Sequence, residues 1–134
     1  MSTSINRQNL LNQAALLAAD LYAARVLSEA NSLSELPYKE VAGLDAHEVA
    51  ETEVSVNKEL ENIQVRKAIC AALESANNDV RDIAKLVGAA LLPLSLSGVV
   101  AIPLTPLAFG VAGLIVFNAG VSAFCSSVTL EKKD

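Results

Sequence analysis

Side chains that could act as acids, bases, nucleophiles or metal ligands are sparse in this chain. It contains one histidine, His47, and two cysteines, Cys70 and Cys125, which lie far apart in the sequence. One imidazole and two distant thiols lack the spacing of a zinc site or of a Cys–His nucleophile pair. The sequence also holds no glycine-rich phosphate loop and no recognisable Ser-His-Asp pattern. It therefore predicts no catalytic residue, no cofactor and no metal site.

Acidic residues cluster between Glu48 and Glu61, and paired carboxylates can serve as a general acid and base. Glu51 and Glu53 are two positions apart and would lie on different faces of a helix, whereas Glu48 and Glu51 would share one. Nothing near them marks a substrate cleft, so we expect a solvated acidic face. A regulatory protein or ligand docking on residues 45–76 is the alternative.

The two cysteines fall in regions of different character. Cys70 lies in the charged part of the chain, and Cys125 lies inside a long apolar run. We therefore predict no disulfide between them, and either a reducing compartment or no redox role.

A weakly polar stripe near the C-terminus offers a different kind of chemistry. Asn118, Ser122 and Cys125 lie at i, i+4 and i+7 of a predicted helix. A buried asparagine in lipid needs a polar partner, so it faces another helix or a watery path. Asn118 and Ser122 are therefore candidate pore-lining residues; interhelical hydrogen bonding without transport is the alternative.

These residues belong to an uncharged run of 45 residues, 86–130. One membrane helix needs roughly 20 apolar residues, so the run is long enough for two. Pro103 and Pro106 lie near its middle, where they would end one helix and start the next. Pro93 and Gly98 should kink or loosen the first helix. The sequence predicts a hydrophobic helical hairpin that inserts into a membrane.

Small residues recur along the second predicted helix of the hairpin. Such residues let membrane helices approach each other closely. The predicted packing residues are Ala108, Ala112, Ala119, Ala123 and Ser126.

The region before the hairpin, residues 1–85, is predicted to form amphipathic helices. An Ala- and Leu-rich helix should run from about Ile5 to Ala30 and pack among other helices. A short helix is expected from Pro37 to Ala42. Asp45 and Glu48 form a capping-box-like pair before a helix that should continue to Ala76. Asn78 should cap a helix that runs directly into the apolar run.

Composition narrows the class of protein. The chain has 134 residues, a net charge of −5 and 52% hydrophobic residues, with a mean hydropathy of +0.40. The acidic surface argues against nucleic-acid binding. Aromatic residues make up 4%, so the aromatic belt of resident membrane proteins is missing. The N-terminus lacks the pattern of a signal peptide.

The uncharged run, and especially the segment AGLIVFNAGVSAFCSSVTLEKKD from Ala112 to Asp134, resembles the hydrophobic hairpin of the pore-forming bacteriocins of the colicin class. The resemblance implies an all-helical domain that permeabilises a membrane. This chain is shorter than those pore domains and has no receptor or translocation region. It therefore fits better with action on the membrane of the cell that makes it, as holins and abortive-infection effectors act.

We thus expect an all-α protein with a soluble helical region (1–85), a hydrophobic hairpin (86–130) and a charged tail (131–134). Its expected function is to oligomerise in a lipid bilayer and permeabilise it. Lys85 and Lys132 flank the hairpin, so both termini are expected on the cytoplasmic side of a cytoplasmic membrane. The alternatives are a membrane-anchored interaction module without conduction, and a soluble oligomer that hides the hairpin in a shared core.

Overall fold

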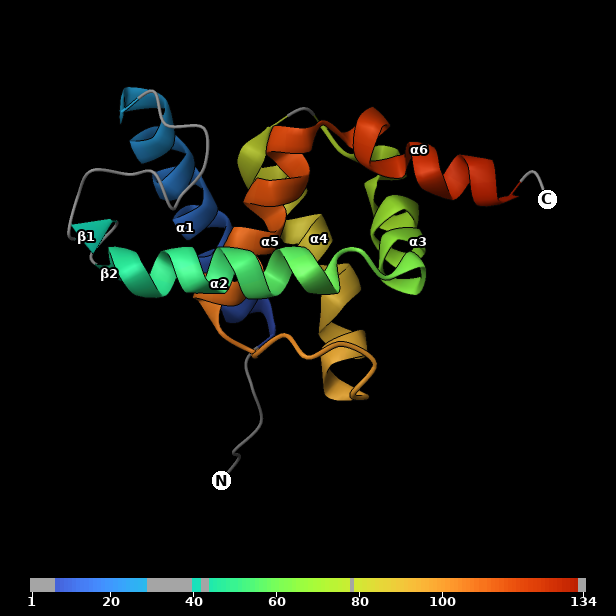
Figure 1. Ribbon diagram of the computed structural model, residues 1–134, viewed down its shortest axis with the longest axis horizontal. Coiled ribbons are helices and arrows are strands. Elements are labelled where there is room, and N and C mark those ends of the chain that lie inside the picture. Colours follow the sequence, from blue (N-terminus) through green and yellow to red (C-terminus); the bar gives the residue numbers. More distant parts are fainter. Residues whose placement is uncertain (1–6, 29–39, 42–43, 78, 133–134) are drawn as a thin grey trace.

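The computed structural model describes residues 7–28, 40–41, 44–77 and 79–132. Its elements, in chain order, are α1 (Arg7–Ser28), β1 (Glu40–Val41), β2 (Leu44–Asp45), α2 (Ala46–Glu59), α3 (Ile63–Ala72), the short 3-10 helix η2 (Leu73–Ser75), α4 (Val80–Leu96), α5 (Pro106–Ala119) and α6 (Val121–Lys132) (Figure 1). The predicted all-α class is confirmed, since the strands form only a two-residue antiparallel ribbon.

Helix α5 lies at the centre of the described structure (Figure 1). Helices α1, α2 and α4 all pack against it. Seven consecutive residues of α5, Ala108 to Leu114, are buried, which covers every face of the helix over nearly two turns. A helix that is apolar all round must be enclosed by protein or lipid, and here the enclosure is made by the other helices of the chain.

Helices α4 and α5 pack against each other as a helical pair, but the pair is not the uninterrupted membrane hairpin predicted from the sequence. Helix α4 ends at Leu96 with Gly98 at φ +83°. The amides of Val99 and Gly98 bond to the carbonyls of Leu94 and Ser95, a Schellman motif that stops the helix. None of the helices in the described part of the chain has the length and hydropathy that crossing a bilayer requires. The membrane-inserting form of the hairpin is therefore not supported.

The predicted breaks fall partly where the prolines and glycines suggested. Thr105 caps α5 by accepting a hydrogen bond from the amide of Ala108, and Pro106 is its first residue. Pro103 lies in the connection between the helices, and Pro93 lies inside the last turns of α4 without ending it.

The second apolar helix is broken, contrary to the prediction. Gly120, at φ +88° and ψ 133°, separates α5 from α6. Residues with side chains avoid this conformation, because the Cβ atom crowds the backbone. The chain changes direction there, and α6 passes over α3 (Figure 1).

The charged half also differs from the prediction at its boundaries. The helix expected from Asp45 to Ala76 is two helices, because Asn62 starts α3 by accepting a hydrogen bond from the amide of Gln64. The short helix expected up to Ala42 is wrong at Glu40–Val41, which pair with β2; its other residues lie outside the described ones.

Helix α1 lies within the range predicted for the first helix, whose predicted ends, Ile5 and Ala30, fall outside the described residues, and α4 starts close to its predicted position. Helix α1 buries a stripe that includes Leu10, Ala14 and Leu21, as expected for a helix packed among others. Asp79 caps α4, one residue after the predicted Asn78, which lies outside the described residues. The predicted boundary between residues 85 and 86 falls within α4.

Candidate functional site

The functional candidate is the enclosed helix α5 together with α6, which continues the same uncharged sequence. Contact between α5 and α1 is close enough to reach the backbone. A Cβ atom at Gly110 would lie 2.9 Å from the carbonyl oxygen of Ala14 and 3.4 Å from the amide nitrogen of Ala18. The absence of a side chain at Gly110 therefore lets α5 lie directly against the backbone of α1.

The contact between α5 and α4 also depends on a glycine, about one turn further along α5. A Cβ atom at Gly113 would lie 2.6 Å from both the Cα and the Cβ atoms of Ala84, a distance that atoms of side chains do not reach. On α4, a Cβ atom at Gly88 would meet Leu11 of α1 at 2.6 Å. Small residues thus bring α1, α4 and α5 together at one tightly packed junction.

The structure divides the predicted packing ridge into two parts. Ala108 and Ala112 are buried in the core, at 2% and 0% exposure. Ala119, Ala123 and Ser126 are exposed. The division follows from the break at Gly120, because α6 leaves the direction of α5 and carries its small residues to the surface.

The two candidate pore-lining residues are on different helices. Asn118 is exposed on α5, and its side-chain oxygen accepts a hydrogen bond of 3.0 Å from Nη2 of Arg25 on α1. Ser122 is exposed on α6. The continuous polar stripe expected from their spacing is therefore absent from this structure, since it required one unbroken helix.

An aromatic contact supports the same end of α5. The rings of Tyr22 and Phe117 meet edge to face, with centroids 5.1 Å apart, and the guanidinium of Arg25 lies 5.7 Å from the Tyr22 ring centroid. Such contacts add to apolar burial and fix the register of two helices. Here they fasten α1 to the end of α5 that precedes the break.

Helix α6 is held against α3 by Arg66. Its Nη1 donates to the carbonyl oxygen of Phe124 at 3.1 Å, and its guanidinium lies 4.6 Å from the centroid of the Phe124 ring. Nε of the same side chain donates to the carbonyl oxygen of Leu60 at 2.9 Å. One arginine therefore ties the end of α2, the start of α3 and the middle of α6 together.

A disulfide between Cys70 and Cys125 joins α3 to α6, with Cα atoms 5.8 Å apart. The prediction that the two cysteines stay apart is wrong, and the argument from it for a reducing compartment no longer holds. The prediction failed because it placed Cys125 on a straight membrane helix, whereas the break at Gly120 carries α6 across α3. Nothing in the local sequence signals this pairing, which depends on the tertiary fold.

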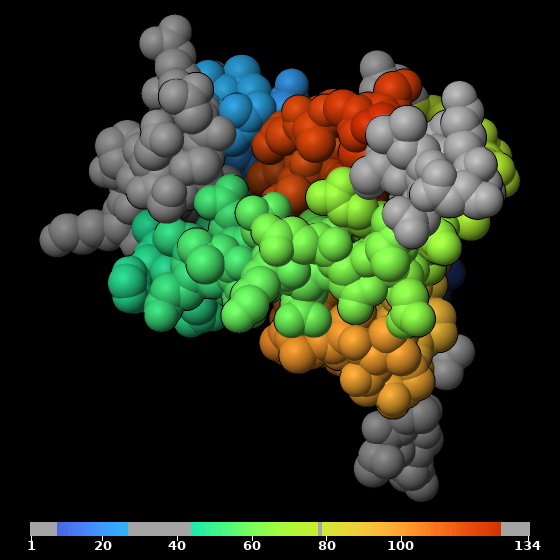
Figure 2. All heavy atoms as spheres, turned by 45° about the vertical axis from the view of Figure 1, so that its right-hand side comes forward, coloured from blue at the N-terminus to red at the C-terminus, as the bar shows by residue number. Residues whose placement is uncertain are grey.

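The connection between α4 and α5 forms an exposed apolar end of the molecule. Leu96 and Val99 are 50% and 44% exposed, and no charged residue occurs between positions 86 and 130. The last turns of α4 form the lower edge of the surface in Figure 2. Glu59 of α2 holds this connection by accepting a hydrogen bond of 3.1 Å from the amide of Ala101.

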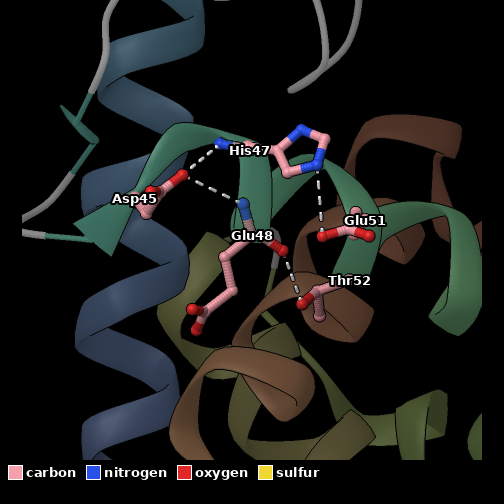
Figure 3. Close-up of polar contacts among 5 residues, drawn as sticks. All are labelled: Asp45, His47, Glu48, Glu51 and Thr52. Carbon is pink, nitrogen blue, oxygen red and sulfur yellow. Dashed lines mark hydrogen bonds and ion pairs between the residues drawn. The ribbon is translucent and has the colours of Figure 1, made fainter.

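The acidic residues at the start of α2 have ordinary structural roles (Figure 3). Asp45 caps the helix by accepting hydrogen bonds from the amides of His47 and Glu48, at 2.8 and 3.3 Å. His47 and Glu51 form a surface pair at 3.4 Å, with both side chains largely exposed. Within the ranges that the structure describes, no group of three potential ligands is placed to hold a metal ion.

Comparison of the chain with protein-family models, with curated proteins and with solved structures found no match.

Proposed function

We propose that this protein stores an apolar helical segment in its core and releases it into a lipid bilayer, where several copies permeabilise the membrane. The stored segment is α5, and α6, which lies at the surface against α3, continues its uncharged sequence as far as Leu130. The bundle described above would be the storage form, and the membrane form would be a rearranged state.

The observation that carries this proposal is the enclosure of α5. This helix of 14 residues has no charged residue and is buried on every side over nearly two turns. The 25 residues 106–130, which include α5 and most of α6, contain no charged residue. As one straight helix it would be about 37 Å long, enough to cross a hydrocarbon core of about 30 Å.

The exposed apolar end between α4 and α5 supplies a first point of contact with lipid. Leu96 and Val99 are about half exposed there, and burying the exposed half of each in a bilayer is worth roughly 1 kcal/mol. Insertion of this end would break the hydrogen bond between Glu59 and Ala101 and separate α4 and α5 from α2.

Conduction requires several copies, because two helices enclose no lumen. The exposed small residues Ala119, Ala123 and Ser126 are available for contact between copies, and Asn118 could exchange its bond with Arg25 for one with a neighbouring helix.

A protein-interaction module is the second candidate function. It is favoured by the packing of the core, because the other helices already bury α5 without lipid. On this alternative the exposed acidic face of α2 would bind a basic partner, and α5 would be a core helix only.

Dye release from phosphatidylcholine vesicles distinguishes the two candidates. Zwitterionic lipid is chosen because an acidic protein is repelled by anionic headgroups. We expect release by the parent protein and its loss in Ala119→Leu and Ala123→Leu, which are exposed in the bundle and should leave its fold intact. Asn118→Leu should weaken release by the ~0.6–2 kcal/mol typical of interhelical polar contacts. Vesicles that stay sealed with the parent protein both with and without dithiothreitol, or Leu variants that release dye as fast as the parent, would refute the proposal.

A further inference from the structure

We propose that the disulfide between Cys70 and Cys125 is a redox latch, which keeps α6 folded back on α3 and opens when a dithiol reduces it. This inference rests on the proposed function, since it assigns the regulation of the same apolar segment. Opening the latch would let α6 swing into line with α5 and complete a helix long enough to enter a bilayer.

The first argument is the position of the disulfide. It lies in the middle of α6 and connects that helix to α3, the element on which α6 mainly packs. Arg66 of α3 also holds α6, through its hydrogen bond to the carbonyl oxygen of Phe124 and its stacking on the Phe124 ring. Phe124 is also buried in the core. Reduction therefore removes the covalent restraint on α6 and leaves the noncovalent ones, which can break and re-form.

The second argument is the nature of the joint. Gly120 is the residue at which α5 and α6 part, and a Cβ atom built there meets nothing within 4 Å. The space beside its Cα atom is therefore open, and both flanking segments are already helical. Straightening requires a change in the φ and ψ angles of this glycine, which glycine makes at low energetic cost.

The third argument is the access of a reductant to the disulfide. Cys70 and Cys125 are both partly exposed. Thiol–disulfide exchange needs a thiolate to reach one of the two sulfur atoms, so a buried bond would be protected. Neither cysteine of this bond is buried.

The chemistry is a two-electron exchange. One thiolate of the dithiol attacks a sulfur of the Cys70–Cys125 bond, which forms a mixed disulfide and frees the other cysteine as a thiolate. The second thiolate of the reagent then displaces the remaining cysteine. The dithiol is oxidised to a cyclic disulfide, and Cys70 and Cys125 take up the two electrons and, as thiols, two protons.

The test uses the full chain in its oxidised form and after treatment with dithiothreitol. Amide hydrogen exchange without lipid reports on α6 directly. We expect exchange over residues 121–132 to rise by roughly tenfold or more on reduction, while the amides of α5 and α1 stay protected. The double variant Cys70→Ser/Cys125→Ser should show the fast exchange without reductant and no response to it. If that variant does not fold, the reduced parent protein supplies the same comparison.

Dye release from phosphatidylcholine vesicles is then measured for the same two forms. Fast release by the reduced form, with slow release by the oxidised form, supports the latch. Equal release by both forms, or α6 exchange that dithiothreitol leaves unchanged, overturns the latch and leaves the proposed function in place. Failure of both forms to release dye overturns the proposed function, and the latch as its regulator falls with it.

Discussion

Replacement of Gly120 by alanine should destabilise the bundle and speed the release of its apolar segment. The glycine adopts φ +88° and ψ 133°, a conformation that costs a residue with a side chain about 1–3 kcal/mol. The added methyl group meets nothing within 4 Å, so this cost is conformational and involves no clash. Within a straight helix the same change gains about 1 kcal/mol. Together these terms favour the straightened form by about 2–4 kcal/mol, or roughly 30- to 1,000-fold.

Gly98→Ala is the matched control. Gly98 has φ +83°, and a Cβ atom there also meets nothing within 4 Å. It should lose similar stability, but it lies at the end of α4 and does not join α5 to α6. Urea unfolding of the oxidised proteins measures the loss of stability in each variant. Dye release in the presence of dithiothreitol measures the rate at which each variant permeabilises vesicles.

We expect both variants to unfold at lower urea concentration, and only Gly120→Ala to release dye faster than its loss of stability explains. Equal release rates for the two variants would show that the break at Gly120 is not the joint. An unchanged stability of Gly120→Ala would contradict the conformation assigned to this glycine.

Three further changes are tested by thermal and urea unfolding: two concern the packing of the core, and one concerns the cap of α2. Gly113→Val should lower the free energy of unfolding by about 1–3 kcal/mol, because its side chain would overlap Ala84, whereas Ala89→Val at an exposed position of the neighbouring helix should have little effect. Phe109→Ala should cost about 3–5 kcal/mol, since this ring is fully buried at the centre; a loss below 1 kcal/mol would mean that α5 is not enclosed. Asp45→Ala should cost about 1 kcal/mol through loss of the cap of α2, and Asp45→Asn should restore most of it, which a merely electrostatic role would not allow.

Local signals in the sequence predicted several elements correctly. Pro106 was expected to start a helix and Asp45 to cap one, and both residues have these roles in the structure. The Ala- and Leu-rich first helix packs among the others, as its apolar stripe predicted. These features depend on neighbouring residues alone, which is why the sequence suffices for them.

The features that decide the candidate site depend on tertiary context. An uncharged run has the same composition whether lipid or protein encloses it, so the enclosure of α5 could not be read from residues 86–130. Gly98 and Gly120 resemble the other glycines of the run, and only the fold distinguishes these two by their positive φ angles. The Cys70–Cys125 bond then follows from the break at Gly120. The start of α3 was missed for another reason: the apolar spacing indicated one continuous helix through Asn62, although asparagine is a common N-cap.

The transfer of α5 from the protein core into a bilayer can be measured most directly with a single fluorescent reporter. The chain contains no tryptophan, so Phe117→Trp places one indole near the middle of residues 106–130. Phosphatidylcholine vesicles carrying doxyl quenchers at different acyl-chain depths then report where that indole lies after reduction with dithiothreitol. The proposal predicts quenching that is strongest for the quenchers nearest the bilayer centre. Fluorescence that no quencher reduces, from a protein that remains folded, would contradict it.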